Sequence, residues 1–192
     1  LHQQPAIISL MGHRSYTTQA LVLKRKKVGE TDRVVFLLSR DYGRFVTIAK
    51  GVRKLNSSKR AFMEPGNIIQ AQFIKTKSLP LLIQAKLISD TNNIRDNLPQ
   101  IRQLVQILEI YDKLFVEQEL SEKLYRLVLD IRLDVINRRA GNRQIQAKLN
   151  QLISALGFPQ ADLTKYDSIL DYVSEIAERP MRSFEYLQVQ SH

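Results

Sequence analysis

The spacing of hydrophobic residues changes once along this chain of 192 residues, from a period of about two to a period of about 3.6. Up to Ser89, short runs rich in Val, Ile, Leu and Thr are separated by turn-forming residues, which is typical of β-strands. From Asn97 onward, apolar residues recur at helical spacing. The chain is therefore expected to fold as a β domain followed by an α domain, with the boundary in the turn-forming stretch at 90–96.

Five short strands are predicted in the first half, with one long connection at 51–66 after the third strand. Gly43 closes a tight turn between the second and third strands, because glycine readily supplies the positive φ of such turns. This pattern suits a small OB-type barrel, and an SH3-like barrel would give nearly the same pattern. The predicted strands are residues 16–23, 33–38, 45–49, 67–74 and 79–88.

Four amphipathic helices are predicted in the second half. Asn97 is expected to cap the first, and Ser121 begins the second. The third runs from Asn142 to Leu156, where Gly157 and then a proline form a stop signal. The fourth is expected to open at Thr164 and to end at Pro180. Because each apolar stripe needs another apolar surface to cover it, we expect a helical bundle.

The net charge of +10 is unevenly divided between the two halves. Residues 1–90 hold 16 Lys and Arg against 5 Asp and Glu, whereas residues 91–192 hold 13 against 14. A basic half of this kind attracts polyanions. Since one sign of charge persists through a strand, a turn and a long loop, we predict nucleic-acid binding by Lys24, Arg25, Lys26, Lys27, Arg33, Arg44, Lys50, Arg53, Lys54, Lys59 and Arg60.

Aromatic side chains beside such cations could stack on the bases of a single strand. Tyr16, Tyr42 and Phe62 are the candidates, and packing within the core or a turn is the alternative for each.

The sequence offers few groups for catalysis. It has no cysteine, and its histidines are His2, His13 and His192, all near the ends. Common nucleophile and base pairs and most transition-metal sites are therefore not expected. No phosphate-cradling glycine motif is present, and no apolar run approaches the roughly 20 residues of a membrane span. We predict a protein that is not an enzyme and has no cofactor, no metal and no membrane segment.

The segment 15–54, SYTTQALVLKRKKVGETDRVVFLLSRDYGRFVTIAKGVRK, resembles the amino-terminal domain of the RecO family of bacterial recombination mediators. The likeness is carried by ALVL, by GETD at 29–32, by YGR at 42–44 and by AKGVRK at 49–54. It weakens afterwards to an LGF segment at 156–158 and MRSFEYL at 181–187.

This resemblance implies an OB-fold at 15–90 and a helical domain at 91–192. Residues 1–14, whose beginning lacks the basic start and the length of a secretory signal, are expected to be a disordered lead-in. It also implies binding of single- and double-stranded DNA, annealing of complementary strands, and cooperation with RecR so that RecA replaces the single-strand-binding protein SSB. Such a protein is expected in the cytoplasm, associated with the nucleoid. The acidic tail of SSB would be held on the second helix by Lys123, Arg126, Arg132, Arg138 and Arg139, for which ordinary surface pairing is the alternative.

One departure from the family concerns zinc. Many members carry a four-cysteine zinc module in the helical domain, whereas the region after Phe158 contains no cysteine. Other functions remain open: a protein-interaction adaptor whose helical half is the working part, an RNA-binding OB module and, after these, a metal-dependent nuclease.

Overall fold

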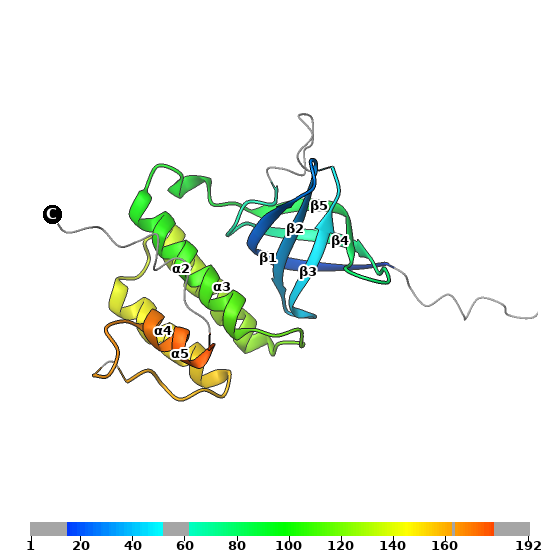
Figure 1. Ribbon diagram of the computed structural model, residues 1–192. Helices are drawn as coiled ribbons and strands as arrows, with labels where there is room; N and C mark the ends of the chain where they lie inside the picture. Colours follow the sequence, from blue (N-terminus) through cyan, green and yellow to red (C-terminus); the bar gives the residue numbers. More distant parts are fainter. Residues whose placement is uncertain (1–14, 52–61, 163, 179–192) are drawn as a thin grey trace, which may run out of the picture.

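The computed structural model describes residues 15–51, 62–162 and 164–178, which form five strands followed by helices (Figure 1). The strands are β1 (Ser15–Val28), β2 (Asp32–Ser39), β3 (Gly43–Ala49), β4 (Ile68–Ile74) and β5 (Leu81–Ser89). After the short 3-10 helix η1 (Asn92–Ile94) come α2 (Leu98–Leu114), α3 (Glu122–Ile136), α4 (Asn142–Ala155) and α5 (Ile169–Ile176).

The strands close into a barrel in the order β1-β2-β3-β5-β4. All neighbouring pairs are antiparallel except β3 and β5, which meet in parallel at Ile48 and Leu81. This is the arrangement of the OB-fold, so the expected fold is confirmed and the SH3-like alternative is excluded.

Strand β1 belongs to two walls of the barrel. Its first part, Ser15 to Leu21, pairs with β4, and the part from Ala20 onward pairs with β2. A register shift between Val22 and Lys24 lets the strand bend from one wall to the other, as β-bulges do. The strand is longer than predicted and includes the whole basic run at 24–27.

Two hydrophobic cores lie on opposite sides of the barrel wall. Inward side chains such as Val35, Leu37 and Phe73 fill the barrel. Outward side chains such as Leu21 and Leu38 join the core of the helices instead. Helix α2 packs against β1 and β2 and also against α3 and α5, so the helical half is anchored on the outside of the barrel.

The loop between α2 and α3 is fixed to the β2–β3 hairpin by backbone hydrogen bonds. Arg44 N donates to Val116 O at 2.9 Å, and Leu120 N donates to Arg40 O at 2.8 Å. A Cβ on Gly43 would lie 2.2 Å from Gln118 O, so only glycine permits this close approach.

The predicted starts of the first three helices are confirmed, and that of the fourth is wrong. Asn97 and Ser121 accept hydrogen bonds from the third residue of α2 and α3, and α4 begins at Asn142. Thr164 instead belongs to a turn, because its N and Oγ1 both donate to Asp162 Oδ1. The last described helix starts after Ser168, whose hydroxyl accepts from Asp171 N, and it ends at Ile176.

Candidate nucleic-acid interface

Strand alternation divides the basic run of β1 between two sides of the sheet. Lys24 lies opposite Phe36, and Lys26 lies opposite Val34. Because directly opposed residues of neighbouring strands share a face, these two lysines point outward with Phe36 and Val34. The residues between and after them, Arg25 and Lys27, belong to the other side.

The outward residues of β1, β2 and β3 form one surface, which we call the basic face. Phe36 lies at its centre, opposite Val46 on β3, and Val34 lies opposite Ile48. The residues of the basic face that the helices leave uncovered are Lys24, Lys26, Val28, Asp32, Val34, Phe36, Arg44, Val46 and Ile48. Asp32 lies at the edge of the face, where its Oδ1 accepts a hydrogen bond from Gly51 N.

Three cations surround the Phe36 ring. Lys24 Nζ lies 4.3 Å from the ring centroid, Arg44 Cζ 5.2 Å and Lys26 Nζ 5.6 Å. Each is within the range of a cation–π interaction, which holds a cation against an aromatic ring without neutralising it. Sequence reasoning did not select Phe36, because the residues from Val34 to Leu38 are all apolar and no alternation shows which of them point outward.

Asp112 of α2 partly neutralises this cluster. Its Oδ1 accepts from Arg44 Nε at 3.0 Å, and its Oδ2 forms an ion pair with Lys24. Lys26 is exposed and has no ion pair with an acidic residue in the described part of the chain, so it is the cation of the cluster most available to a ligand.

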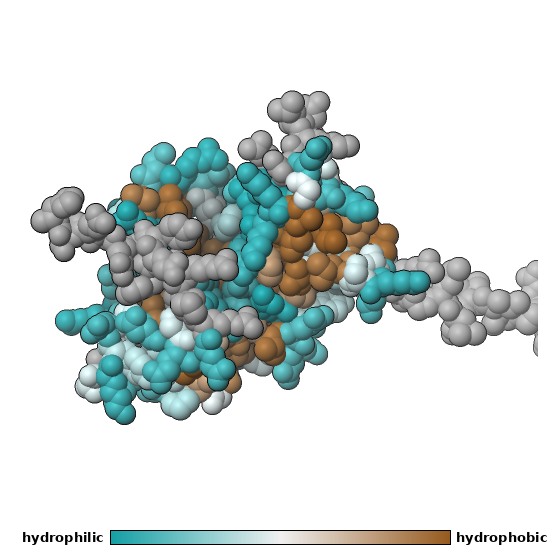
Figure 2. Space-filling view, viewed as in Figure 1, coloured by the Kyte–Doolittle hydropathy of each residue, from teal (hydrophilic) through white to brown (hydrophobic). Residues whose placement is uncertain are grey.

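Apolar side chains predominate at the far end of the basic face, beside Asp32. Val34, Val46 and Ile48 are half-buried, and Val28 is 46% exposed. Figure 2 shows a brown area over the barrel, bordered by teal side chains. An apolar surface beside cations suits a single strand, whose bases favour apolar contacts while its phosphates require positive charge.

Other cations in the predicted set are placed differently. Arg25 pairs with Glu64, and Arg33 is buried, so neither belongs to the basic face. Lys27 is exposed on the opposite side of β1, and Lys50 is exposed immediately after β3. Four further predicted contacts, Arg53, Lys54, Lys59 and Arg60, lie outside the described residues.

The predicted stacking residues Tyr16 and Tyr42 lie away from the basic face. Their ring centroids are 4.7 Å apart, and Tyr16 also stacks on Phe73 at 5.2 Å, next to the barrel core. Burial, with Tyr42 and Glu117 nearby, raises the pKa of Tyr16 to about 12. Phe62 likewise packs against the barrel core.

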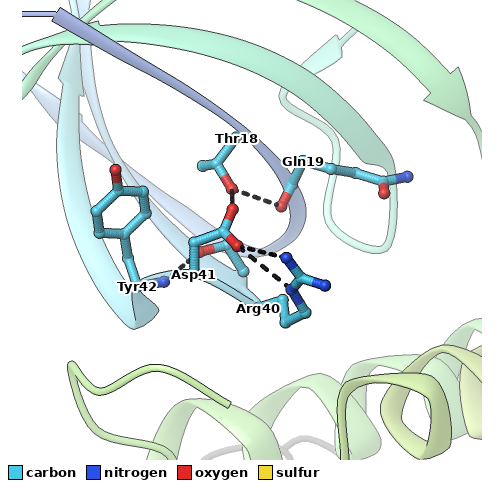
Figure 3. Close-up of polar contacts among 6 residues, drawn as sticks. Thr18, Gln19, Arg40, Asp41 and Tyr42 are labelled. Carbon is cyan, nitrogen blue, oxygen red and sulfur yellow. Dashed lines mark hydrogen bonds and ion pairs between the residues drawn. The ribbon is translucent and has the colours of Figure 1, made fainter. Parts of the chain in front are cut away.

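The surroundings of Tyr42 are acidic as well as aromatic. Figure 3 shows Asp41 beside it, where Asp41 Oδ2 accepts from Thr18 Oγ1 at 2.7 Å and Oδ1 accepts from Arg40. A carboxylate at this position repels phosphates, so this aromatic cluster fits packing better than base stacking.

Arg132 is buried between the two halves, so its prediction as a surface cation for a partner is wrong. It is 0% exposed, and it donates to Gly66 O, Ser89 Oγ and Asp90 O. Burial lowers the pKa of Arg132 to about 10, which still leaves the guanidinium charged at neutral pH. Its role is to join α3 to the barrel.

A groove of about 780 Å³ lies between the start of α3 and the end of α4. Leu124 and Leu127 line it together with the acidic Glu122 and Asp130. Lys123 is the cation there without an ion-pair partner in the described part of the chain. Arg126 also lines the groove, but it pairs with Glu122. Arg138 and Arg139 follow α3 at its other end and do not line the groove.

Two absences apply to the described residues alone. No group of three or more His, Asp or Glu side chains there could hold a metal ion. None of the helices seen there has both the length and the apolar character needed to cross a membrane.

Comparison with known proteins identifies the barrel. Residues 11–90 match the family described as "Recombination protein O N terminal". The DNA repair protein RecO of Cutibacterium acnes (strain DSM 16379 / KPA171202) is 35% identical over 72 residues, which cover 38% of this chain and 29% of that protein.

Two further relatives match over more of the chain. The DNA repair protein RecO of Salinibacter ruber (strain DSM 13855 / M31) is 28% identical over 166 residues, 83% of this chain and 63% of the relative. The protein of that name from Thermodesulfovibrio yellowstonii (strain ATCC 51303 / DSM 11347 / YP87) is 30% identical over 144 residues, 74% of this chain and 58% of the relative. The chain thus spans less than two thirds of the length of these relatives.

The closed OB-type barrel thus belongs to the family of RecO amino-terminal domains. Beyond the barrel, the chain is similar to DNA repair proteins named RecO, in line with the resemblance of its sequence motifs.

Proposed function

We propose that this chain is a non-catalytic DNA-binding protein of DNA repair, which holds single-stranded DNA on the basic face of its barrel. The observation that carries the proposal is the gathering of Lys24, Lys26 and Arg44 around Phe36 beside an apolar strip. The family supports the same conclusion, because its members named above are DNA repair proteins. Residues 15–90 would be the DNA-binding unit, and 91–192 the helical unit.

The mechanism would be electrostatic. Cations on the barrel screen the repulsion between two phosphate backbones, so complementary strands pair faster on the protein than alone. Double-stranded DNA would bind through the same cations. Within the cytoplasm, at the nucleoid, such a protein would work with RecR to help RecA replace SSB on single-stranded DNA.

The basic face is tested by two neighbouring lysines that differ in the side of β1 they occupy. Lys26→Glu places a carboxylate beside Phe36 and Val34, and we expect it to weaken single-strand binding by about fivefold to tenfold. Lys27→Glu changes the charge equally on the other side of the strand, and we expect less than about a twofold effect. Fluorescence anisotropy with a labelled oligonucleotide measures both, and equal effects would argue against the basic face.

Salt dependence tests the electrostatic mechanism. If about six of the eleven cations predicted from the sequence meet phosphates, the logarithm of affinity falls with the logarithm of salt concentration at a slope near −4, from ~0.7 per phosphate. A slope near zero would reject the mechanism.

We further propose that the groove between α3 and α4 holds the acidic, apolar tail of SSB. Leu124 and Leu127 would receive its apolar end, and Lys123 would meet its carboxylates. Lys123→Glu should weaken binding of a peptide copy of that tail by about tenfold, whereas Arg139→Glu, outside the groove, should leave it unchanged. Calorimetric titration of the peptide measures both variants.

One observation favours the adaptor function. Asp112 holds Lys24 and Arg44 in ion pairs, which leaves the barrel with fewer cations for DNA. An adaptor would bind the peptide but not DNA, so titration of both ligands against the same preparation separates the two functions. Competition between RNA and DNA oligomers of one sequence separates a DNA-binding from an RNA-binding barrel.

A further inference from the structure

A second surface of the barrel lies on the wall formed by β4, β5 and the first part of β1. Two rows of side chains cross its three strands: Thr17, Gln72 and Gln84 are aligned in one row, and Gln19, Gln70 and Lys86 in the other. We call these six residues the amide face. They surround a shallow hollow of about 430 Å³, for which five of them supply lining side chains.

The four glutamines of the amide face have free hydrogen-bonding groups. Gln72 is half-buried, and Gln19, Gln70 and Gln84 are exposed. None of the four side chains hydrogen-bonds to another residue in the part of the chain that the structure describes. Each amide therefore presents two N–H donors and a carbonyl acceptor outward from a rigid sheet.

The electrostatics of this wall favour an anionic ligand. Lys86 lies on the face, and Lys75 and Lys77 are exposed in the turn between β4 and β5. The sequence contains no Asp or Glu between Pro65 and Ser89. A solvated face without a ligand ordinarily mixes both signs of charge.

Nucleic acid fits the amide face better than a protein partner does. The buried centre of a protein interface is enriched in aromatic and apolar side chains, whereas the two rows consist of Thr, Gln and Lys. Side-chain amides and hydroxyls are, in contrast, common donors to phosphate and sugar oxygens, and such contacts fix the position of a strand without reading its sequence.

We propose that the amide face is a second single-strand site, which holds the phosphates and sugars of one nucleic-acid strand while the basic face holds another. This inference rests on the proposed function, and it adds a site for the second strand that annealing requires. The two sites lie on different walls, because β1 changes walls at its bulge between Val22 and Lys24. With fewer cations, the second site binds more weakly and depends less on salt than the first.

The test counts strands on the full chain by native mass spectrometry, during titration with a short thymidine oligonucleotide that cannot pair with itself. One variant combines Gln70→Glu, Gln72→Glu and Gln84→Glu. The matched control combines Gln118→Glu, Gln144→Glu and Gln160→Glu, which add the same charge at exposed positions of the helical half, outside the groove between α3 and α4. Gln72 and Gln84 face each other, so two glutamates at these positions would repel each other and destabilise the sheet. The single variant Lys86→Glu therefore serves as a milder probe of the same face.

We expect the parent chain and the control to bind two strands. The triple variant and Lys86→Glu should keep the first association constant within about twofold and lose about tenfold or more of the second. An unchanged second constant, or equal losses of both constants, would overturn the second site. A parent chain that binds one strand only would also overturn it, leaving the face to a protein or a second copy of the chain. A parent chain that binds no strand would reject the proposed function as well.

Discussion

Arg44 of the barrel donates through Nε to Asp112 of α2 at 3.0 Å, and the Asp112 side chain is only 9% exposed. The other oxygen of Asp112 holds Lys24, so one carboxylate binds two of the three cations around Phe36. The helical half therefore limits the charge that the barrel can offer to a ligand.

Replacing Asp112 by Asn should strengthen single-strand binding. Lys24 and Arg44 would become available to two more phosphates, so the salt slope should steepen by about 1.4. The free energy of unfolding should fall by about 1 kcal/mol, because two partly exposed ion pairs are lost. Asp96→Asn removes the same charge at an exposed position and should change neither quantity. An unchanged slope for Asp112→Asn would show that the two cations do not meet DNA.

Phe36→Leu should weaken binding without unfolding the barrel. Leucine keeps an apolar side chain against the helical core but has no π system to hold the three cations. We expect a loss of about 0.5–1 kcal/mol, or about two- to fivefold in affinity, measured by anisotropy. Phe45→Leu removes a ring inside the barrel instead, so it should lower stability with little direct effect on affinity at temperatures where the variant is folded.

Gly29 and Gly43 have similar φ angles, so alanine variants of the two separate the cost of backbone strain from the cost of a steric clash between the two halves. Gly29 has φ +56° and no atom within 4 Å of an added Cβ, so Gly29→Ala should cost only about 1 kcal/mol. Gly43 has φ +61° and meets the backbone of the α2–α3 loop, so Gly43→Ala should cost about 1–3 kcal/mol more. Urea denaturation followed by circular dichroism measures both, and equal costs would mean that the loop moves aside freely.

Arg132→Met should be strongly destabilising. It leaves the carbonyl oxygens of Gly66 and Asp90 without their guanidinium donor inside the protein, at a cost of about 2–4 kcal/mol. Arg126→Met on the same helix removes an exposed pair with Glu122 and should cost less than about 0.5 kcal/mol. The difference between the two unfolding free energies measures the contribution of the buried arginine.

Tyr125 should make the protein sensitive to alkali. Burial and, to a smaller extent, Asp41 raise its pKa to about 12, against 10.0 for an ordinary tyrosine. Between these values the unfolded chain has released the proton while the folded chain retains it, so stability falls as pH rises from 10 to 12. Tyr125→Phe should remove this part of the loss.

At neutral pH, Tyr125→Phe should change stability by only about 0–1 kcal/mol, because the Tyr125 hydroxyl is buried without a hydrogen-bond partner among the described residues. The raised pKa of Tyr16 also lowers the free energy of unfolding as pH rises through this range. The lowered pKa of Arg132 raises the free energy of unfolding over the same range, because the unfolded chain then binds the proton more tightly than the folded chain. Tyr16 and Arg132 are present in the parent chain and in the Tyr125→Phe variant, so a difference between their alkaline unfolding curves reports Tyr125.

Local sequence signals predicted most of the fold. Alternation identified the five strands, and Asn97 and Ser121 carry recognisable caps. The fourth helix failed because Thr164 and Ser168 are both good capping residues, and the neighbouring Asp162 draws Thr164 into a turn. Nothing within the sequence of β1 indicated that the strand continues past the bulge, since the pairing with β2 that extends it is a tertiary contact.

The candidate site was less predictable than the fold. A run of basic letters does not tell which side of a strand each residue takes, and this alone separates Lys26 from Lys27. Arg132 resembles its exposed neighbours in sequence, yet it is buried because the barrel carbonyls that receive it come from residues more than 40 positions away. Phe36 was overlooked because an aromatic residue in an apolar strand ordinarily belongs to the core.

The bulge in β1 has a mechanical consequence. One continuous piece of backbone runs beneath both the basic face and the amide face, with no loop or hinge between them. Two molecules resting on these faces would be kept at a constant separation and angle by covalent geometry, whatever their own sequences. The barrel would then act as a rigid spacer, and lengthening β1 by two residues at the bulge would alter that geometry while keeping the alternation of side chains on each surface.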